Sequence, residues 1–128
     1  FYCTLLIVIQ KKTSRKIMQY HYLGWPDHGL PSDINLMMKL IEVGREAVES
    51  KKEEKIMVHC SAGVGRTGTL IALINLTGEA KGASKDKKLS IFRTVRQLRE
   101  QRMHMVEREE QYLFVYKILK IWLEKAFH

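Results

Sequence analysis

One stretch constrains this chain more than any other: residues 59–68, which read HCSAGVGRTG. A short apolar segment, residues 56–58, precedes it and has the length of a buried strand. An apolar run at helical spacing, residues 66–76, follows it. A strand, a glycine-containing loop and a helix in this order bring backbone N–H groups and a helix N-terminus to one point, where anions bind. The stretch therefore predicts a phosphate-binding loop between a buried strand and a helix.

Cys60 and Arg66 add a possible chemistry to this loop. A thiol becomes a nucleophile when it ionises, and a helix N-terminus together with nearby cationic groups lowers its pKa. Arg66 can fold back across the loop, where its planar fork matches two phosphoryl oxygens. A cysteine after an apolar strand is often only a buried thiol. The glycines at positions 63, 65 and 68 permit close backbone approach and favour a phosphate cradle with a nucleophile.

The rest of the chain alternates between strand-like and helix-like patterns. We expect strands over residues 2–9 and 16–22, separated by a polar link, and a loop over residues 24–31. Asp33 is the expected cap of a first helix that extends to about residue 50. Apolar residues at helical spacing predict further helices around residues 66–76, 89–98 and 112–123. The predicted class is α/β, a mixed central sheet flanked by helices.

Composition limits the classes of function. The 128 residues fit one domain or part of one, and 45% hydrophobic with 28% charged residues exclude a disordered chain. The net charge of +8 favours anionic partners, but no stacking-aromatic or recognition-helix pattern points to nucleic acid. No apolar run approaches the roughly 20 residues of a membrane span. With only two cysteines, Cys60 and Cys3, we expect a reducing compartment and place Cys3 in the core.

Several motifs together resemble the protein tyrosine phosphatases. Residues 59–69 are similar to the signature loop of that family, and WPDHG at 25–29 is similar to its mobile acid loop. Residues 98–102 and 105–112 resemble its later arginine-containing helix end and its glutamine loop. The combination resembles the phosphotyrosine-specific branch. It covers the later half of the family domain, so we expect residues 1–128 to be the later part of a single domain whose N-terminal part is absent.

The resemblance implies a role for each catalytic position. Cys60 would attack phosphorus, Arg66 would bind the phosphoryl oxygens, and Asp27 would protonate the departing tyrosine oxygen. Thr67 would ease departure of the thiolate, and Gln111 would order the hydrolytic water. The implied phosphate-binding residues are Ser61, Ala62, Gly63, Val64, Gly65 and Arg66. The resemblance implies no cofactor and no metal.

Four further positions have a supporting role by the same resemblance. His59 would tune the thiol, and Trp25 would act at a hinge of the acid loop. Arg99 and Arg102 would support the active-site loops. Plainer interpretations remain: Trp25 as a core residue, Asp27 as a turn residue after proline, and both arginines as surface charges at a helix end.

Two positions depart from the family pattern. Glu107 stands where active members usually have a water-positioning glutamine, and its negative charge predicts slower hydrolysis of the intermediate unless Arg108 or another cation neutralises it. His104 stands where a glycine is usual; it would narrow the pocket entrance or lie exposed in a loop. Two hypotheses follow: a phosphotyrosine-protein phosphatase, or a catalytically weak domain that binds phosphotyrosine. Either would act on phosphotyrosine proteins in the cytoplasm, free or as the cytoplasmic domain of a membrane protein.

Overall fold

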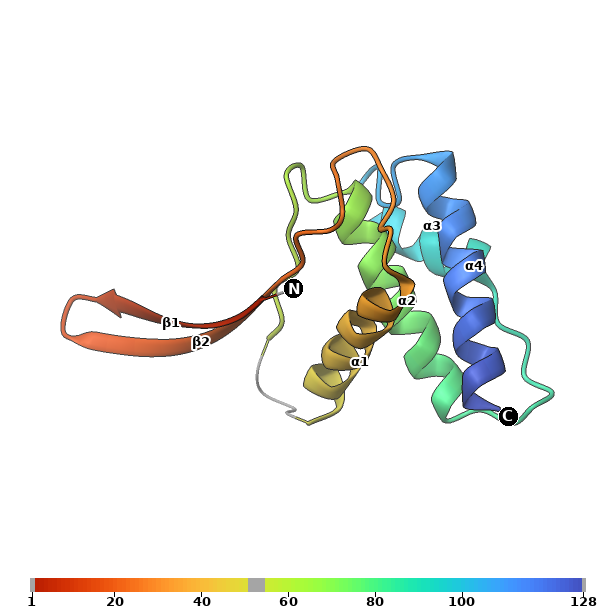
Figure 1. Cartoon of the computed structure of the whole chain (residues 1–128), viewed down its shortest axis with the longest axis horizontal. Coiled ribbons are helices and arrows are strands. Elements are labelled where there is room, and N and C mark those ends of the chain that lie inside the picture. The colour runs from red at the N-terminus through yellow and green to blue at the C-terminus, as the bar shows by residue number, and fades with distance from the viewer. Residues whose placement is uncertain (1, 51–54, 128) are drawn as a thin grey trace.

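The computed structural model describes residues 2–50 and 55–127, which form an antiparallel hairpin and four helices (Figure 1). In the hairpin, β1 (Tyr2–Gln10) pairs with β2 (Thr13–His21) in a register that sets Gln10 opposite Thr13. Lys11, with a φ of 55°, and Lys12 form the turn. Both predicted strands are confirmed, but β2 begins earlier than expected and includes most of the polar link. Polar residues are accepted there because the strand is exposed on both faces.

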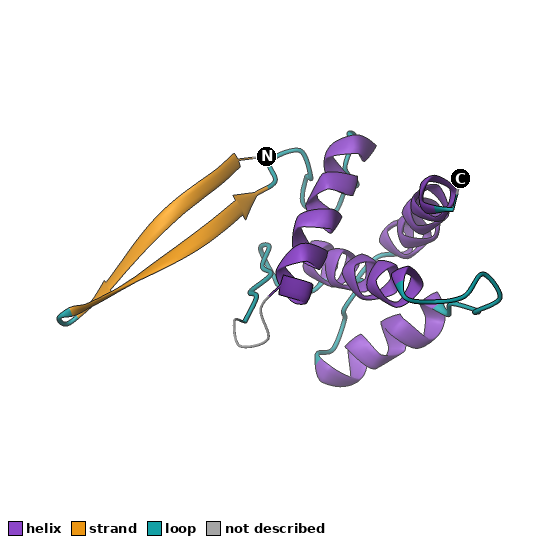
Figure 2. Ribbon diagram, turned by 90° about the horizontal axis from the view of Figure 1, so that it is seen from below, coloured by secondary structure: helices purple, strands orange, loops and turns teal. Residues whose placement is uncertain are grey.

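The hairpin extends away from the helices (Figures 1 and 2). Its apolar side chains are exposed on both faces, with the neighbouring Ile7 61% and Val8 46% accessible. Cys3 is also exposed, so its predicted place in the core is wrong. The reason is that β1 pairs with β2 alone among the described strands, and a two-stranded ribbon buries neither face by itself.

The four predicted helices are confirmed as α1 (Ile34–Ser50), α2 (Gly65–Lys81), α3 (Ile91–Gln101) and α4 (Glu109–Ala126). Asp33 caps α1 as expected, because its Oδ1 accepts a hydrogen bond from the Leu36 N–H at 3.0 Å. Ser90 caps α3 in the same way, accepting from the Arg93 N–H at 3.1 Å. Local capping chemistry thus accounts for where these two helices begin.

Helix α2 is the centre of the helical layer and packs against the other three helices. Because it is buried on several sides, its core residues include threonines as well as Leu73 and Leu76. The hydroxyl groups of Thr69 and Thr77 donate to the carbonyls of Gly65 and Leu73, at 2.8 and 2.7 Å. Both bonds stay within the helix, so these two hydroxyl groups cost little on burial.

The predicted central sheet is not present among the described residues, where the hairpin is the only sheet. The segment expected as a buried strand, residues 56–58, is irregular, and Ile56 and Met57 are 45% and 85% accessible. A strand needs a neighbour to receive its N–H and C=O groups. No described strand lies beside this segment, so the expected strand–loop–helix unit reduces to an irregular segment, a loop and a helix.

Candidate active site

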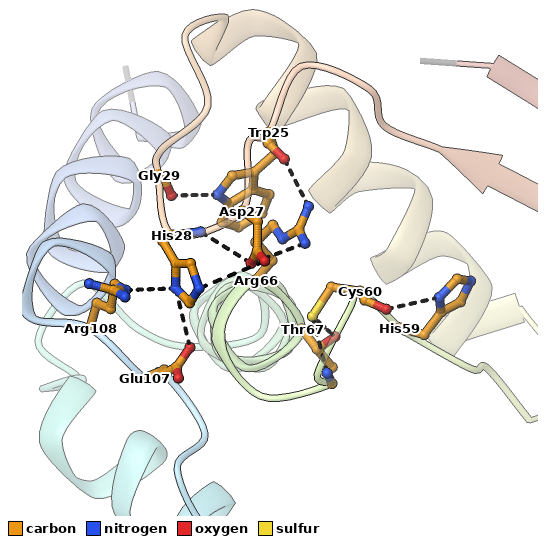
Figure 3. A network of polar contacts seen from close by, with 11 residues as sticks. Trp25, Asp27, His28, Gly29, His59, Cys60, Arg66, Thr67, Glu107 and Arg108 are labelled. Atoms are coloured by element: carbon orange, nitrogen blue, oxygen red, sulfur yellow. Dashed lines mark hydrogen bonds and ion pairs between the residues drawn. The ribbon is translucent and has the colours of Figure 1, made fainter.

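The thiol of Cys60 lies where the chain turns into α2, in a loop over residues 60–65 that we call the cradle. Its Sγ accepts a hydrogen bond from the Gly63 N–H at 3.3 Å and another from Thr67 Oγ1 at 3.1 Å (Figure 3). Both donors come from within seven residues of Cys60. The local path of the chain therefore surrounds the sulfur with donors, as the sequence predicts.

Two opposing influences act on the pKa of Cys60. Burial is the largest single one and raises the pKa, since a thiolate loses hydration. Hydrogen bonds from the Thr67 hydroxyl and from the backbone of Thr67, Gly63 and Val64 lower it. Together the hydrogen bonds outweigh the effect of burial, so the pKa of the thiol lies below its ordinary value of 9.0. The sequence anticipated this direction but attributed part of it to a nearby cation, whereas the causes are hydrogen bonds.

The outside of the cradle is fastened by residues from distant segments. Arg102 Nη2 donates to the Ala62 carbonyl at 3.2 Å, and the Val106 N–H donates to the Val64 carbonyl at 3.0 Å. Gly63 turns the chain between these two attachments with a φ of +73°, a conformation that favours glycine. The carbonyls of the cradle are therefore bonded on its outer side, while the Gly63 N–H faces the sulfur.

Arg99 supports the neighbouring loop. Its Nε and Nη2 donate to the carbonyls of Met105 and Val106, at 2.9 and 2.7 Å. This loop passes so close to α2 that a Cβ at Gly68 would lie 2.4 Å from the Val106 nitrogen. The sequence allows Arg99 and Arg102 to be either supports of the active-site loops or surface charges at a helix end. In the structure, both contact the loops around the thiol.

Arg66 faces the acid loop, which we define as residues 25–29. Its Nη1 donates to the Trp25 carbonyl at 3.0 Å, and its Nη2 lies 3.2 Å from Asp27 Oδ1 (Figure 3). Its Nε is buried and has no hydrogen-bond partner among the described residues. The guanidinium of Arg66 thus contacts the acid loop through Trp25 and through the expected general acid, Asp27. Arg66 joins the two halves of the site.

The acid loop is a tight turn around the buried Trp25. The Trp25 indole Nε1 donates to the Gly29 carbonyl, and the Gly29 N–H donates to the Pro26 carbonyl, at 3.0 and 3.1 Å. The Trp25 ring packs in the core with Phe114, their centroids 6.1 Å apart. Trp25 is therefore a core residue by position, and it also anchors the loop.

Sequence reasoning missed one contact at this site. Arg108 Nε donates to His28 Nδ1 at 2.9 Å, across 80 residues of chain. Glu107 Oε2 lies 4.0 Å from the same nitrogen, and His28 itself has a φ of 60° (Figure 3). The adjacent charges at 107 and 108 were the available signal, but they suggested an ion pair with each other. Arg108 instead reaches to the acid loop.

The remaining predicted residues lie around this centre. Gln111 is buried, and its Oε1 accepts from the Arg108 N–H at 3.1 Å at the start of α4. A Cβ at Gly65 would lie 2.9 Å from Gln111 Nε2, so the amide borders the cradle. The His59 ring is exposed, with its Nδ1 3.5 Å from the Cys60 carbonyl oxygen and not directed at the sulfur. His104 is exposed in its loop and has a φ of 64°.

Ser61 and Ala62 are exposed at the rim of the cradle, whereas Gly65 is buried. In the parts of the chain that the structure describes, no group of three His, Cys, Asp or Glu side chains is arranged to hold a metal ion. Nor does any described helix have the length and apolar character needed to cross a membrane. Chemically, the site offers a hydrogen-bonded thiol, a guanidinium and a carboxylate that meet at one helix N-terminus.

Comparison with known proteins matches residues 2–120 to the family model described as protein-tyrosine phosphatase. Among curated relatives, human receptor-type tyrosine-protein phosphatase alpha is 40% identical over 115 residues, which are 90% of this chain and 14% of that protein. The tyrosine-protein phosphatase corkscrew of Drosophila virilis is 36% identical over 118 residues, which are 88% of this chain and 15% of that protein. The chain thus spans about a seventh of the length of these relatives.

Solved structures agree in three dimensions. A protein tyrosine phosphatase of Trypanosoma cruzi superposes with a TM-score of 0.79 at 35% identity, over 96% of this chain and 42% of that one. One from Trypanosoma brucei superposes with a TM-score of 0.74 at 33% identity, over 89% and 39%. The fold is therefore that of these phosphatases, represented over about two fifths of their chains.

Proposed function

Because the chain belongs to the protein-tyrosine phosphatase family, we propose that it hydrolyses phosphotyrosine in proteins through a cysteinyl-phosphate intermediate. One observation supports this proposal above the others: the Cys60 thiol accepts hydrogen bonds from Gly63 and Thr67 in a loop that leads into a helix N-terminus. These bonds lower the pKa of Cys60, so the nucleophilic form is favoured.

In the first step, the Cys60 thiolate attacks phosphorus and the bond from phosphorus to the tyrosine oxygen breaks. Arg66 binds the phosphoryl oxygens, and backbone N–H groups of the cradle complete the anion site. Asp27 gives its proton to the phenolic oxygen as it leaves, because a phenol departs more easily than a phenolate. The products are a dephosphorylated tyrosine side chain in the substrate protein and the cysteinyl-phosphate at Cys60.

In the second step, water attacks phosphorus and the bond from phosphorus to sulfur breaks. Asp27, now a carboxylate, takes the proton of the water. Thr67 donates to the departing sulfur through the hydrogen bond that it already makes at 3.1 Å. Gln111 orders the water from its position beside the cradle.

Arg66 must change partners during this cycle. It is paired with Asp27 at 3.2 Å, and an ion-paired aspartate is not the proton donor that the first step needs. An incoming phosphoryl group carries more negative charge than Asp27 and competes for the same guanidinium. We infer that the phosphoryl group of the substrate binds the Arg66 guanidinium and thereby frees the carboxyl of Asp27.

Glu107 favours the second candidate, a domain that captures phosphotyrosine and releases it slowly. A Cβ at Gly65 would lie 3.1 Å from Glu107 Oε2, which places the carboxylate beside the cradle. His28 Nδ1, 4.0 Å from this carboxylate, already accepts a hydrogen bond from Arg108. The carboxylate is therefore available to repel the anionic intermediate.

The test is phosphate release from a phosphotyrosine peptide by the wild-type chain and by Cys60→Ser. We expect the variant to lose at least about a thousandfold in turnover, because a serine hydroxyl is not ionised at neutral pH. The variant should still bind the peptide. Cys3→Ser is the matched control and retains turnover, because Cys3 is exposed on the hairpin. Tight peptide binding by the wild-type chain with no release of phosphate would instead establish the weak-turnover candidate.

We place this reaction on phosphotyrosine proteins in the cytoplasm, where thiols stay reduced. The family membership supports the class of substrate. The free cysteine nucleophile supports the compartment, whether the parent protein is soluble or anchored in a membrane.

A further inference from the structure

We propose that Arg108 is a positioning residue that holds the acid loop over the cradle through His28; this inference rests on the proposed phosphatase function. The contact is the Arg108 Nε–H donating to His28 Nδ1 at 2.9 Å. It joins the residue before α4 to a loop 80 positions earlier. Arg108 therefore acts on Asp27 through its neighbour and does not touch the reacting atoms.

We call this contact between Arg108 and His28 the bridge. Its two ends differ in how firmly they are held. Arg108 is fixed at the start of α4, where its N–H donates to the buried Gln111 at 3.1 Å and its carbonyl accepts from the Tyr112 N–H at 3.1 Å. His28 lies in an exposed loop with a φ of 60°, a conformation that costs energy for a residue with a side chain. The bridge thus connects a strained loop residue to a rigid helix end.

The bridge bears directly on the general acid. The His28 N–H donates to Asp27 Oδ1 at 3.1 Å, and His28 Nε2 lies 3.8 Å from Asp27 Oδ2. Moving His28 therefore moves the carboxyl of Asp27 relative to the cradle. Since an acid must reach the leaving oxygen within hydrogen-bond distance, a displacement of about 1 Å can cost up to about a hundredfold in rate.

The first measurement does not depend on turnover. The chain has two tryptophans, and Trp25 reports on the acid loop because its indole N–H donates to Gly29 within it. Trp122, which packs against Arg45, serves as an internal reference. In a nitrogen–proton correlation spectrum, we expect Arg108→Ala to shift or broaden the Trp25 indole signal and to leave the Trp122 signal unchanged.

Matched variants separate the bridge from a general loss of charge. Arg96→Ala removes an exposed arginine that pairs with Glu100 on α3, and we expect both indole signals to stay in place. Arg108→Lys keeps a donor and should restore part of the Trp25 signal. Arg108→Ala combined with His28→Ala should change it no more than His28→Ala alone, because His28→Ala already removes the contact that Arg108 makes. An additive change, or a Trp25 signal unaffected by Arg108→Ala, overturns the proposal.

Kinetics then test the consequence for catalysis. With phenyl phosphate, whose leaving group needs a proton, Arg108→Ala should lower kcat by about tenfold and change KM little. With p-nitrophenyl phosphate, whose leaving group needs less help, the loss should be smaller. Equal losses on both substrates contradict a positioning role. If the wild-type chain releases no phosphate, the proposed function fails, and the Trp25 signal still decides whether the bridge exists.

Discussion

The cradle and the acid loop belong to the same site (Figure 3), yet the chain builds them in different ways. The bonds to Cys60 Sγ come from donors three and seven residues away. The acid loop is held to the rest of the site by Arg66 and Arg108, across 41 and 80 residues. The first region is formed largely by local backbone geometry, and the second by side chains that meet only in the folded molecule.

This difference teaches which half of the reaction each region controls. The cradle determines the ionisation of the nucleophile, because its hydrogen bonds lower the pKa of Cys60. The acid loop determines where Asp27 stands, because Arg66 and His28 contact it from both sides. The two functions should therefore respond separately to substitution, and the following predictions test that separation from the largest expected effect to the smallest.

After Cys60→Ser, the largest effect is expected for Asp27→Ala. Removing the proton donor should lower kcat by about a hundredfold, within the usual range for a general acid, and leave phosphopeptide binding intact. Alkylation of Cys60, followed against pH, should be unchanged, since Asp27 is not among the causes of its lowered pKa. An unchanged turnover rate on the mildly acidic side of neutral would show that Asp27 is not the acid.

A smaller effect is expected for Gly68→Ala, which tests how tightly the cradle is packed from behind. The new Cβ would lie 2.4 Å from the Val106 nitrogen, so the fold must shift, at a cost of about 1–3 kcal/mol in the free energy of unfolding. Gly78→Ala, on the same helix with nothing within 4 Å, is the control and should stabilise by about 0.5–1 kcal/mol. Urea unfolding measures both, and equal shifts would mean that the contact at Gly68 carries no strain.

The smallest effect is expected for Thr67→Val, which keeps the shape of a buried side chain and removes its hydroxyl. The loss of its hydrogen bond to sulfur raises the pKa of Cys60, so the alkylation curve moves to higher pH. We would measure it in a Cys3→Ser background, where Cys60 is the remaining thiol. A curve that stays in place would assign the lowered pKa to the backbone donors alone.

The same pKa shift predicts how stability depends on pH. Because the pKa of Cys60 is lower in the folded chain than in the unfolded one, ionisation of this thiol stabilises the fold at pH values above 9.0. That contribution is lost as the pH falls through the folded pKa. Thr67→Val should reduce it, and Cys60→Ser should abolish it.

The sequence by itself determined the helices, the hairpin and the identity of the cradle. Helical spacing and local capping residues such as Asp33 act over a few positions, so the helices that they form can be predicted from the sequence. The same holds for the donors around Cys60, which lie within one loop and the first turn of α2. Local interactions depend on residues that are close in the sequence, so they can be predicted without the rest of the fold.

Only the tertiary structure decided the partners of the long side chains and the burial of the strands. Arg66 lies against Asp27, and Arg108 against His28, because packing of the helices brings remote segments within reach of these flexible cations. Residues 56–58 are apolar yet irregular, and Cys3 is exposed, because a strand is paired and buried only where other elements lie beside it. Spacing along the chain records which residues can interact locally, but distances across the fold depend on how all the elements pack.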